Sequence, residues 1–430
     1  MKKKNSCYKT VLLILGFAAL NTLVPDSLSS QVSNSERKTK TLHPFASLYQ
    51  PILEEFRLSG HPGVGAFIRT REEGIWNGMA GYARIEDKTP IRPESLFNTL
   101  SSAKAYIAAA ILLLWEEGWI DLDVCIDQYL PDSICDRIAN GHSATVHQLL
   151  AHTSGIPDSD EKSPDIELIN DPYSWTWQDI LEGVYGLPPL FPPGTKLEYR
   201  STNFMLLAVI IDELTGSHAN FLTTRIFQPL ALQNTYYKLE ANLPCPPNLV
   251  DLYYDRYGDG NLENATDVLC TLYYNSHYGS SGISATLEDC ARFMENLMEG
   301  NIIGPSALAI MTSPSFPGFE WRGLGIGVID WTDNQGISHR FYEMAGSGAE
   351  GMAQTRYFPV EGISISIATN VGSANRPNAH DNFNKLLNDL TSAVFDGRGI
   401  QTLPTGKKIK NKSLKKKYFD LKKIKSEVFD

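Results

Sequence analysis

The sequence predicts an α+β fold in which one antiparallel sheet, flanked by terminal helices, is interrupted by an inserted and mostly helical subdomain. Between residues 119 and 320, helical patterns alternate with long loops rich in Pro, Gly and Asp. Strand-like runs occupy both ends of the 430-residue chain, at 63–70, 75–84, 323–330, 352–359 and 363–370. Strands from the two ends are therefore expected to meet in a single sheet.

Helices are expected at three places around this sheet. Residues 45–58 place Phe45, Leu48, Ile52 and Phe56 at helical spacing, and a second helix is expected at 382–394. Together they would cover one face of the sheet. A third helix is expected to begin at Ser101 and to end at Gly118, and its apolar run predicts burial on all sides.

Composition limits the classes of function. A chain that is 42% hydrophobic can form a large core, and a net charge of −11 argues against nucleic acid as a partner. Cys125, Cys135, Cys245, Cys270 and Cys290 form no C-x-x-C pair, which argues against a metal or redox motif. Most are expected to be free buried thiols, with Cys125–Cys135 as a candidate disulfide.

The two ends of the chain differ from the body. Residues 1–30 combine a lysine-rich start, an apolar run at 11–20 and small residues at Ser27 and Ser29, which predicts a secretory signal peptide or, alternatively, an uncleaved anchor. The protein is therefore expected to be exported, periplasmic or secreted. Residues 31–44 would be a linker, 45–398 the folded domain and 399–430 a basic tail.

The tail carries a strong positive charge. Residues 407–430 contain ten lysines and three acids, a net charge of 10 − 3 = +7. Two interpretations stay open. Apolar residues at helical spacing favour an amphipathic helix on an anionic membrane surface, whereas the lysine content favours a solvated, disordered segment.

A lysine inside a very apolar segment indicates a reaction site. In "NTLSSAKAYIAAA", Lys104 follows Ser101 by three residues, so the two side chains would share one face of a helix. A serine hydroxyl becomes a good nucleophile when a base removes its proton. Burial disfavours the charged form of a lysine, which would make Lys104 such a base. The alternative is a lysine that reaches solvent.

Several blocks of the sequence resemble one family. The first is "LFNTLSSAKAYIAAAILLLWEEGWIDLDVCIDQYLP", followed by "LLAHTSGIPD", "FPPGTKLEYRSTNFMLLAVIIDELTG", "IFQPLALQNTYY" and "GSSGISATLEDCARFMENLM". In order and spacing they resemble the serine β-lactamase and penicillin-binding-protein superfamily, and among its branches the class C β-lactamases, D-aminopeptidases and family VIII esterases. The resemblance covers roughly residues 45–395 and implies the β-lactamase/transpeptidase-like fold.

The resemblance implies roles for individual residues. Ser101 matches the nucleophile, Lys104 the base of the first motif and Tyr199 the tyrosine of the Tyr-x-Asn motif, which would share the proton. The backbone N–H groups of Ser101 and Ser347 would form the oxyanion hole, with Gly346 beside them. His152 of "HTSG" is expected to be structural. The reaction implied is hydrolysis of a small ester or amide without a cofactor or metal.

Two positions depart from the family pattern. Ser201 stands where the tyrosine motif has asparagine, and Met344 stands in the cationic or imidazole position of the third motif, Met344-Ala345-Gly346. A methionine cannot bind a carboxylate, and Glu343 would repel an anion if it pointed inward. These departures favour an esterase or amidase. The alternatives are a peptidoglycan or D-amino-acid peptidase, a weak β-lactamase, or a non-catalytic binding or envelope protein. The oligomeric state is left open.

Overall fold

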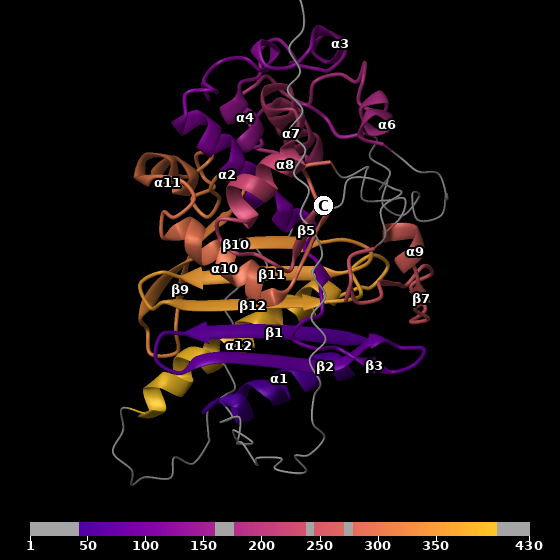
Figure 1. Ribbon diagram of the computed structural model, residues 1–430, viewed down its shortest axis with the longest axis vertical. Coiled ribbons are helices and arrows are strands. Elements are labelled where there is room, and N and C mark those ends of the chain that lie inside the picture. Colours follow the sequence, from indigo (N-terminus) through magenta and orange to yellow (C-terminus); the bar gives the residue numbers. More distant parts are fainter. Residues whose placement is uncertain (1–42, 160–175, 238–244, 271–277, 402–430) are drawn as a thin grey trace, which may run out of the picture. The chain divides into compact units, whose positions relative to one another are not determined.

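The computed structural model describes residues 43–159, 176–237, 245–270 and 278–401, all of which belong to one compact unit that begins at His43 (Figure 1). The predicted signal segment, most of the linker and nearly all of the basic tail lie outside the described residues. No helix in the described ranges combines the length and the apolar character that a membrane span requires.

One seven-stranded antiparallel sheet joins the two ends of the chain, as predicted. Its strand order is β3-β2-β1-β12-β11-β10-β9, so β1 from the first strands pairs with β12 from the last. The strands are β1 (Gly63–Thr70), β2 (Gly74–Arg84), β3 (Thr89–Pro90), β9 (Gly327–Thr332), β10 (Ser338–Ser347), β11 (Met352–Phe358) and β12 (Ile363–Thr369). β1, β11 and β12 are buried along almost their whole length because both faces of the sheet are covered.

The terminal helices α1 (Ala46–Leu58) and α12 (Ala379–Gln401) lie against one face of the sheet, as predicted (Figure 1). Their apolar residues form one core cluster with the strands, in which Leu53, Ile365 and Leu387 are fully buried. Such burial contributes about 1.5–3 kcal/mol per large side chain. α12 extends beyond the predicted 382–394 at both ends.

The inserted helical region lies on the opposite face (Figure 1). Helix α10 (Leu287–Met298) contacts four strands, and its Phe293 stacks on Tyr106 of helix α2 (Ala103–Glu116) at a centroid distance of 3.6 Å. The other helices are α3 (Asp132–Cys135), α4 (Val146–Leu150), α6 (Trp177–Glu182), α7 (Ser201–Thr215), α8 (His218–Leu222), α9 (Thr266–Val268) and α11 (Pro305–Thr312), with short turns η1 (Leu100–Ser102), η2 (Ile126–Gln128) and the π-helical η3 (Thr223–Phe227).

A small three-stranded sheet connects the helical region to the start of α2. It pairs β4 (Phe97–Asn98) with β8 (Ile283–Ala285), and β8 with β5 (Thr235–Tyr237). Thr99 continues this pairing, because its N–H donates to the carbonyl of Ile283 at 2.8 Å. A separate pair joins β6 (Tyr253–Tyr254) and β7 (Glu263–Asn264). The pairing with β8 therefore fixes the segment just before Ser101.

Two predicted element boundaries were wrong. Residues 323–326 are not a strand, because Gly323 N–H bonds to the Ile326 carbonyl and Gly325 has φ +72°, which closes a turn before β9 begins at Gly327. The helix predicted to start at Ser101 begins with the 3-10 turn η1, and its α-helical part starts at Ala103.

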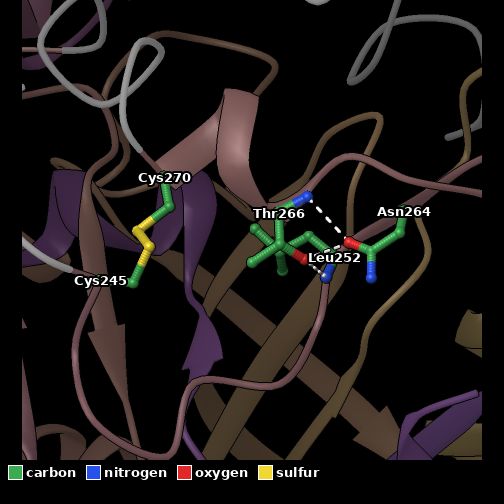
Figure 2. Close-up of a disulfide and its surroundings, with 5 residues drawn as sticks. All are labelled: Cys245, Leu252, Asn264, Thr266 and Cys270. Atoms are coloured by element: carbon green, nitrogen blue, oxygen red, sulfur yellow. Dashed lines mark hydrogen bonds between the residues drawn. A yellow bond between two sulfur atoms is a disulfide. The ribbon is translucent and has the colours of Figure 1, made fainter. Parts of the chain in front are cut away.

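The predicted Cys125–Cys135 pair was also wrong. Both thiols are free, and the disulfide joins Cys245 to Cys270, with 5.8 Å between their Cα atoms (Figure 2). The segment that follows Cys245 is tied to the same region by Thr266, whose hydroxyl accepts from the Leu252 N–H (Figure 2). The prediction chose two cysteines that are close in sequence. A disulfide instead requires two Cα atoms that are close in space, and the fold decides which these are.

Candidate active site

The candidate nucleophile follows a residue with an unusual backbone conformation. Leu100 has φ +54°, in the left-handed region that a residue with a branched side chain rarely adopts. Its N–H bonds to Asn98 Oδ1 at 3.3 Å, and its side chain is buried. The strained turn is thus fixed by neighbouring groups, and it presents Ser101 at the start of α2.

Ser101, Lys104 and Tyr199 come together in the structure. Lys104 Nζ lies 3.1 Å from Ser101 Oγ, and the Tyr199 hydroxyl donates to the same oxygen at 3.0 Å. The first pair meets because residues three apart share a face of the helical turn. Tyr199 is 98 residues away from Ser101 in sequence, and the two meet only in the folded chain. We call these three residues the proton-transfer cluster.

Lys104 is buried among oxygen acceptors and aromatic rings. Its side chain is almost inaccessible, and Nζ also donates to the carbonyl of Ser280 at 2.9 Å, just before β8. The ring centroids of Tyr199 and Phe204 lie 4.9 and 6.0 Å from Nζ. Among the described carboxylates, none lies within the 4.0 Å of an ion pair with Lys104. The Lys104 amine therefore meets a hydroxyl, a carbonyl oxygen and two aromatic rings, and no carboxylate of the described residues.

Tyr199 lies two residues before helix α7, whose first turn is held by an aspartate. The Asp158 carboxylate accepts from the backbone N–H groups of Ser201 and Thr202 at 3.0 and 2.7 Å. An anion at a helix N-terminus satisfies donors that have no partner within the helix. Ser201 thus meets Asp158 through its backbone, and its hydroxyl makes no hydrogen bond with the proton-transfer cluster.

His152 fastens the segment that carries Tyr199. Its carbonyl accepts from Glu198 N–H at 2.9 Å, its Nδ1 accepts from Arg200 N–H at 3.2 Å, and its ring lies 4.5 Å from the Tyr199 ring. Burial, reinforced by the charges of Arg322 and Lys104, holds its pKa well below the usual value. A neutral imidazole bonded in this way positions the tyrosine and does not contact Ser101.

Strand β10 approaches Ser101 through its backbone. Gly346 packs so closely that a Cβ there would lie 2.7 Å from Ser101 N and 2.4 Å from the Thr99 carbonyl oxygen. This position therefore requires glycine. Ser347, the next residue, bonds through its hydroxyl to Ser373 Oγ at 2.9 Å. Two backbone segments that could each supply an N–H donor are thus adjacent.

Met344 lies on the same face of β10 as Gly346, because alternate residues of a strand share a face. Its side chain is 2% exposed and belongs to the core cluster of the helical region. Glu343 was expected to repel an anion only if it pointed inward, and it does not. Its carboxylate forms an ion pair with Arg356 at 2.7 Å, and Arg356 in turn bonds to Asn388 of α12 on the opposite face.

One cation near Tyr199, Arg322, was not predicted from the sequence. The Arg322 Cζ lies 5.0 Å from the centroid of the Tyr199 ring and 5.6 Å from that of Trp321. Its backbone belongs to the turn before β9, which packs on α2, since a Cβ on Gly325 would lie 3.0 Å from the Lys104 carbonyl oxygen. No motif marks this arginine, and only the fold brings it to Tyr199.

The described ranges contain no group of three or more His, Cys, Asp or Glu side chains that could hold a metal ion. The groups around Ser101 are a hydroxyl, an amine, a phenol and backbone amides. Such a set supports nucleophilic attack on a carbonyl carbon with proton transfer through Lys104 and Tyr199.

A serine whose hydroxyl meets a lysine and a tyrosine is typical of serine hydrolase-like proteins that use no histidine base. The family follows from a direct match: a family model described as beta-lactamase matches residues 50–389. The chain belongs to the beta-lactamase family.

Curated relatives match a part of the chain. Penicillin-binding protein 4* of Bacillus subtilis is 27% identical over 256 residues, which are 56% of this chain and 53% of that protein. Protein flp of Staphylococcus aureus is 28% identical over 189 residues, which are 44% of this chain and 37% of that protein. This chain thus spans about half, or less, of the length of these relatives.

Solved structures show the same fold. The D-amino acid amidase from Ochrobactrum anthropi SV3, complexed with L-phenylalanine amide, has a TM-score of 0.70 at 23% identity, covering 82% of this chain and 99% of that one. The D-stereospecific amidohydrolase from Streptomyces sp. has a TM-score of 0.68 at 23% identity, covering 82% and 98%. At this identity the likeness concerns the fold alone.

Proposed function

We propose that this protein is a serine hydrolase that cleaves ester or amide bonds through an acyl-enzyme on Ser101. The observation that carries the proposal is the double contact of Ser101 Oγ, at 3.1 Å from Lys104 Nζ and 3.0 Å from the Tyr199 hydroxyl. A nucleophile within hydrogen-bond reach of a base, itself oriented by other groups, is the geometry that activated serines require.

In the acylation step, Lys104 takes the Ser101 proton while Oγ attacks the substrate carbonyl. The oxyanion that forms is stabilised by the N–H groups of Ser101 and Ser347, each worth about 10²–10³ in rate in comparable enzymes. The proton passes through Tyr199 or Lys104 to the leaving alcohol or amine. A water molecule, deprotonated by the same groups, then releases the acyl group.

The strand side of the site supports a proposal about the substrate. The third-motif position offers the apolar, buried Met344 instead of a cation. Short-chain esters and simple amides, which place no charge against β10, are the substrates proposed. A D-amino-acid amidase or peptidase is the second candidate, because two structural neighbours carry names of that kind. p-Nitrophenyl esters compared with a series of D-Ala peptides and D-amino acid amides separate the two.

The decisive test is covalent labelling with a fluorophosphonate probe, read by intact mass. Wild type should gain one adduct, Ser101→Ala none, and Ser102→Ala the same adduct as wild type. Ser102 is the matched control because it is the adjacent buried serine. Folded wild type that gains no adduct would instead support the non-catalytic alternative, in which the same scaffold binds a ligand or envelope component.

Export and membrane binding are separate proposals, since they rest on residues 1–30 and 399–430. The basic tail should bind anionic liposomes weakly, and salt should reduce this binding because surface charges are screened. Equal binding by a chain that ends at residue 398 would contradict the role of the tail.

A further inference from the structure

A buried histidine of helix α8 uses both of its ring nitrogens, although it lies outside the proton-transfer cluster. His218 is fully buried, its Nδ1 lies 2.8 Å from Asp212 Oδ1, and its Nε2 lies 2.9 Å from the Tyr237 hydroxyl. Asp212 also accepts from the Tyr278 hydroxyl and from the backbone N–H of His218, both at 2.5 Å. A buried polar side chain that is bonded at both ends holds one orientation and fixes its neighbours.

The hydrogen bonds run in one direction, from the backbone to Asp212. The Tyr237 hydroxyl accepts from the Gly279 N–H at 2.8 Å, and burial raises its pKa, so it keeps a proton to donate. Because a carboxylate only accepts, Nδ1 of His218 donates to Asp212, and the lone pair of Nε2 accepts the Tyr237 proton. We call Asp212, His218 and Tyr237 the histidine network.

The histidine network ends next to the residue that holds Lys104. Gly279 directly precedes Ser280, whose carbonyl accepts from Lys104 Nζ at 2.9 Å. On its other side Gly279 packs on helix α7, where an added Cβ would lie 2.5 Å from the Phe204 carbonyl oxygen. The backbone at Gly279 is thus held between α7 and the Tyr237 hydroxyl, and the next carbonyl is directed at Lys104.

We propose that His218 is a positioning residue for Lys104. It acts through the Tyr237 hydroxyl, which fixes the Gly279 N–H and with it the Ser280 carbonyl. The inference rests on the proposed hydrolase function and adds to it a part of the site that touches no substrate. Since that carbonyl is one of the two oxygens that the Lys104 amine contacts, its displacement would move the amine relative to the nucleophile.

Tyr237→Phe tests the link between the histidine network and the backbone. Without the hydroxyl, the Gly279 N–H loses its acceptor and the loop that holds Lys104 can shift. The kcat for p-nitrophenyl butyrate should fall about 10- to 100-fold while KM changes less than about 2-fold, because a small displacement of a catalytic group slows the reaction more than it weakens binding.

Tyr253→Phe is the matched control. The Tyr253 hydroxyl is also buried in the protein, where it accepts from the Ile85 N–H at 2.8 Å and donates to Glu86 Oε2 at 2.7 Å. Its loss should lower the melting temperature about as much as Tyr237→Phe does and leave kcat unchanged. Equal losses of kcat in the two variants would overturn the proposal, because any lost buried hydrogen bond would then have the same effect.

Two amide variants separate the two nitrogens of His218. The side chain of His218→Gln is long enough to accept from the Tyr237 hydroxyl, whereas the shorter side chain of His218→Asn reaches only toward Asp212. His218→Gln should therefore keep kcat within about 3-fold of wild type, and His218→Asn should lose about as much as Tyr237→Phe. The same kcat in both amide variants would contradict a role that runs through Nε2.

A signal from Lys104 itself separates this proposal from the function on which it rests. In protein labelled with ¹³C at the lysine Cε atoms, the Lys104 resonance is identified by its absence from Lys104→Met. It should shift in Tyr237→Phe and His218→Asn and stay in place in Tyr253→Phe, whether or not wild type cleaves an ester. An unmoved resonance in the first two variants would refute the role of His218 even if wild type is an active esterase.

Discussion

The two sides of Ser101 are built on different principles. On one side the proton-transfer cluster consists of side chains that bond to one another, with Lys104 and Tyr199 both on Ser101 Oγ. On the other side β10 approaches through the backbone of Gly346, and the side chain at the third-motif position, Met344, is buried in the core. Bond cleavage can therefore be supported while the usual contact for an anion is absent.

The two sides differ in which contacts depend on the identity of a side chain. A backbone N–H donor is kept when its own side chain is replaced, whereas a base or a cation is lost. Met344 and Lys104 are both buried, so replacing Lys104 by methionine and Met344 by lysine tests the two sides in opposite directions.

The largest effect is expected for Lys104→Met, which removes the base and keeps the length of the side chain. Ester hydrolysis should fall by at least about 10³-fold, because proton transfer alone contributes about 10²–10⁴ and the nucleophile also loses its activation. The free energy of unfolding should stay unchanged or rise, since an apolar group replaces a buried amine. Steady-state rates and thermal unfolding measure both, and a variant with wild-type rates would contradict the assignment.

Tyr199→Phe should reduce kcat by about 10²-fold or more, because the phenol no longer hands a proton to or from Ser101 Oγ. The ring keeps its contact with His152, so the melting temperature should change little. Tyr185→Phe is a suitable control, since Tyr185 lies over Arg137 in the helical region. Equal rates for wild type and Tyr199→Phe would remove the phenol from the reaction.

Met344→Lys tests whether the Met344 position on β10 can accept a cation. An ammonium forced into the core cluster should destabilise the fold by about 3 kcal/mol or more and should not create a carboxylate site. Met344→Leu, which conserves volume, should cost less than about 1.5 kcal/mol and leave the rates unchanged. Urea unfolding is the measurement. A stable Met344→Lys variant would mean that this side chain reaches solvent.

Gly346→Ala should lower kcat by about 10²-fold, which corresponds to the loss of one oxyanion donor. Its Cβ would meet Ser101 N at 2.7 Å, so the backbone of the nucleophile must move. Gly336→Ala is the control for an added methyl group, because a Cβ there meets no atom within 4 Å. Undiminished turnover in Gly346→Ala would show that the donors tolerate displacement.

The smallest expected effect is the contribution of His152 to the pH dependence of the free energy of unfolding. Because the pKa of His152 is lowered in the folded state, the unfolded chain binds more protons as the pH falls below about 6.5. The free energy of unfolding should therefore decrease with falling pH, by up to about 1.4 kcal/mol per pH unit from this group. In His152→Asn that part of the slope should be lost. Identical slopes in unfolding titrations between pH 5 and 8 would contradict a buried neutral imidazole.

The sequence predicted those parts of the site that depend on local spacing or on a motif. Ser101 and Lys104 are three residues apart, so any helical turn brings them together. Tyr199 was predicted because its flanking segment resembles a family motif. Arg322 and Asp158 carry no such signal. Both meet the site through contacts between segments distant in sequence, and neither residue type is unusual in a loop.

The same division holds for the fold. Alternating and apolar runs determined β1, β11 and β12, as well as the two terminal helices, because each pattern follows from the period of its own element. The left-handed Leu100 and the Cys245–Cys270 disulfide were decided by the tertiary structure. A strained φ angle and a pair of meeting thiols depend on neighbours that only the completed chain supplies. The sequence alone thus determined that Ser101 and Lys104 meet, because one helical turn brings them together, whereas the tertiary structure decided that Tyr199 reaches Ser101 and that Arg322 lies against the Tyr199 ring, because these contacts join segments distant in sequence.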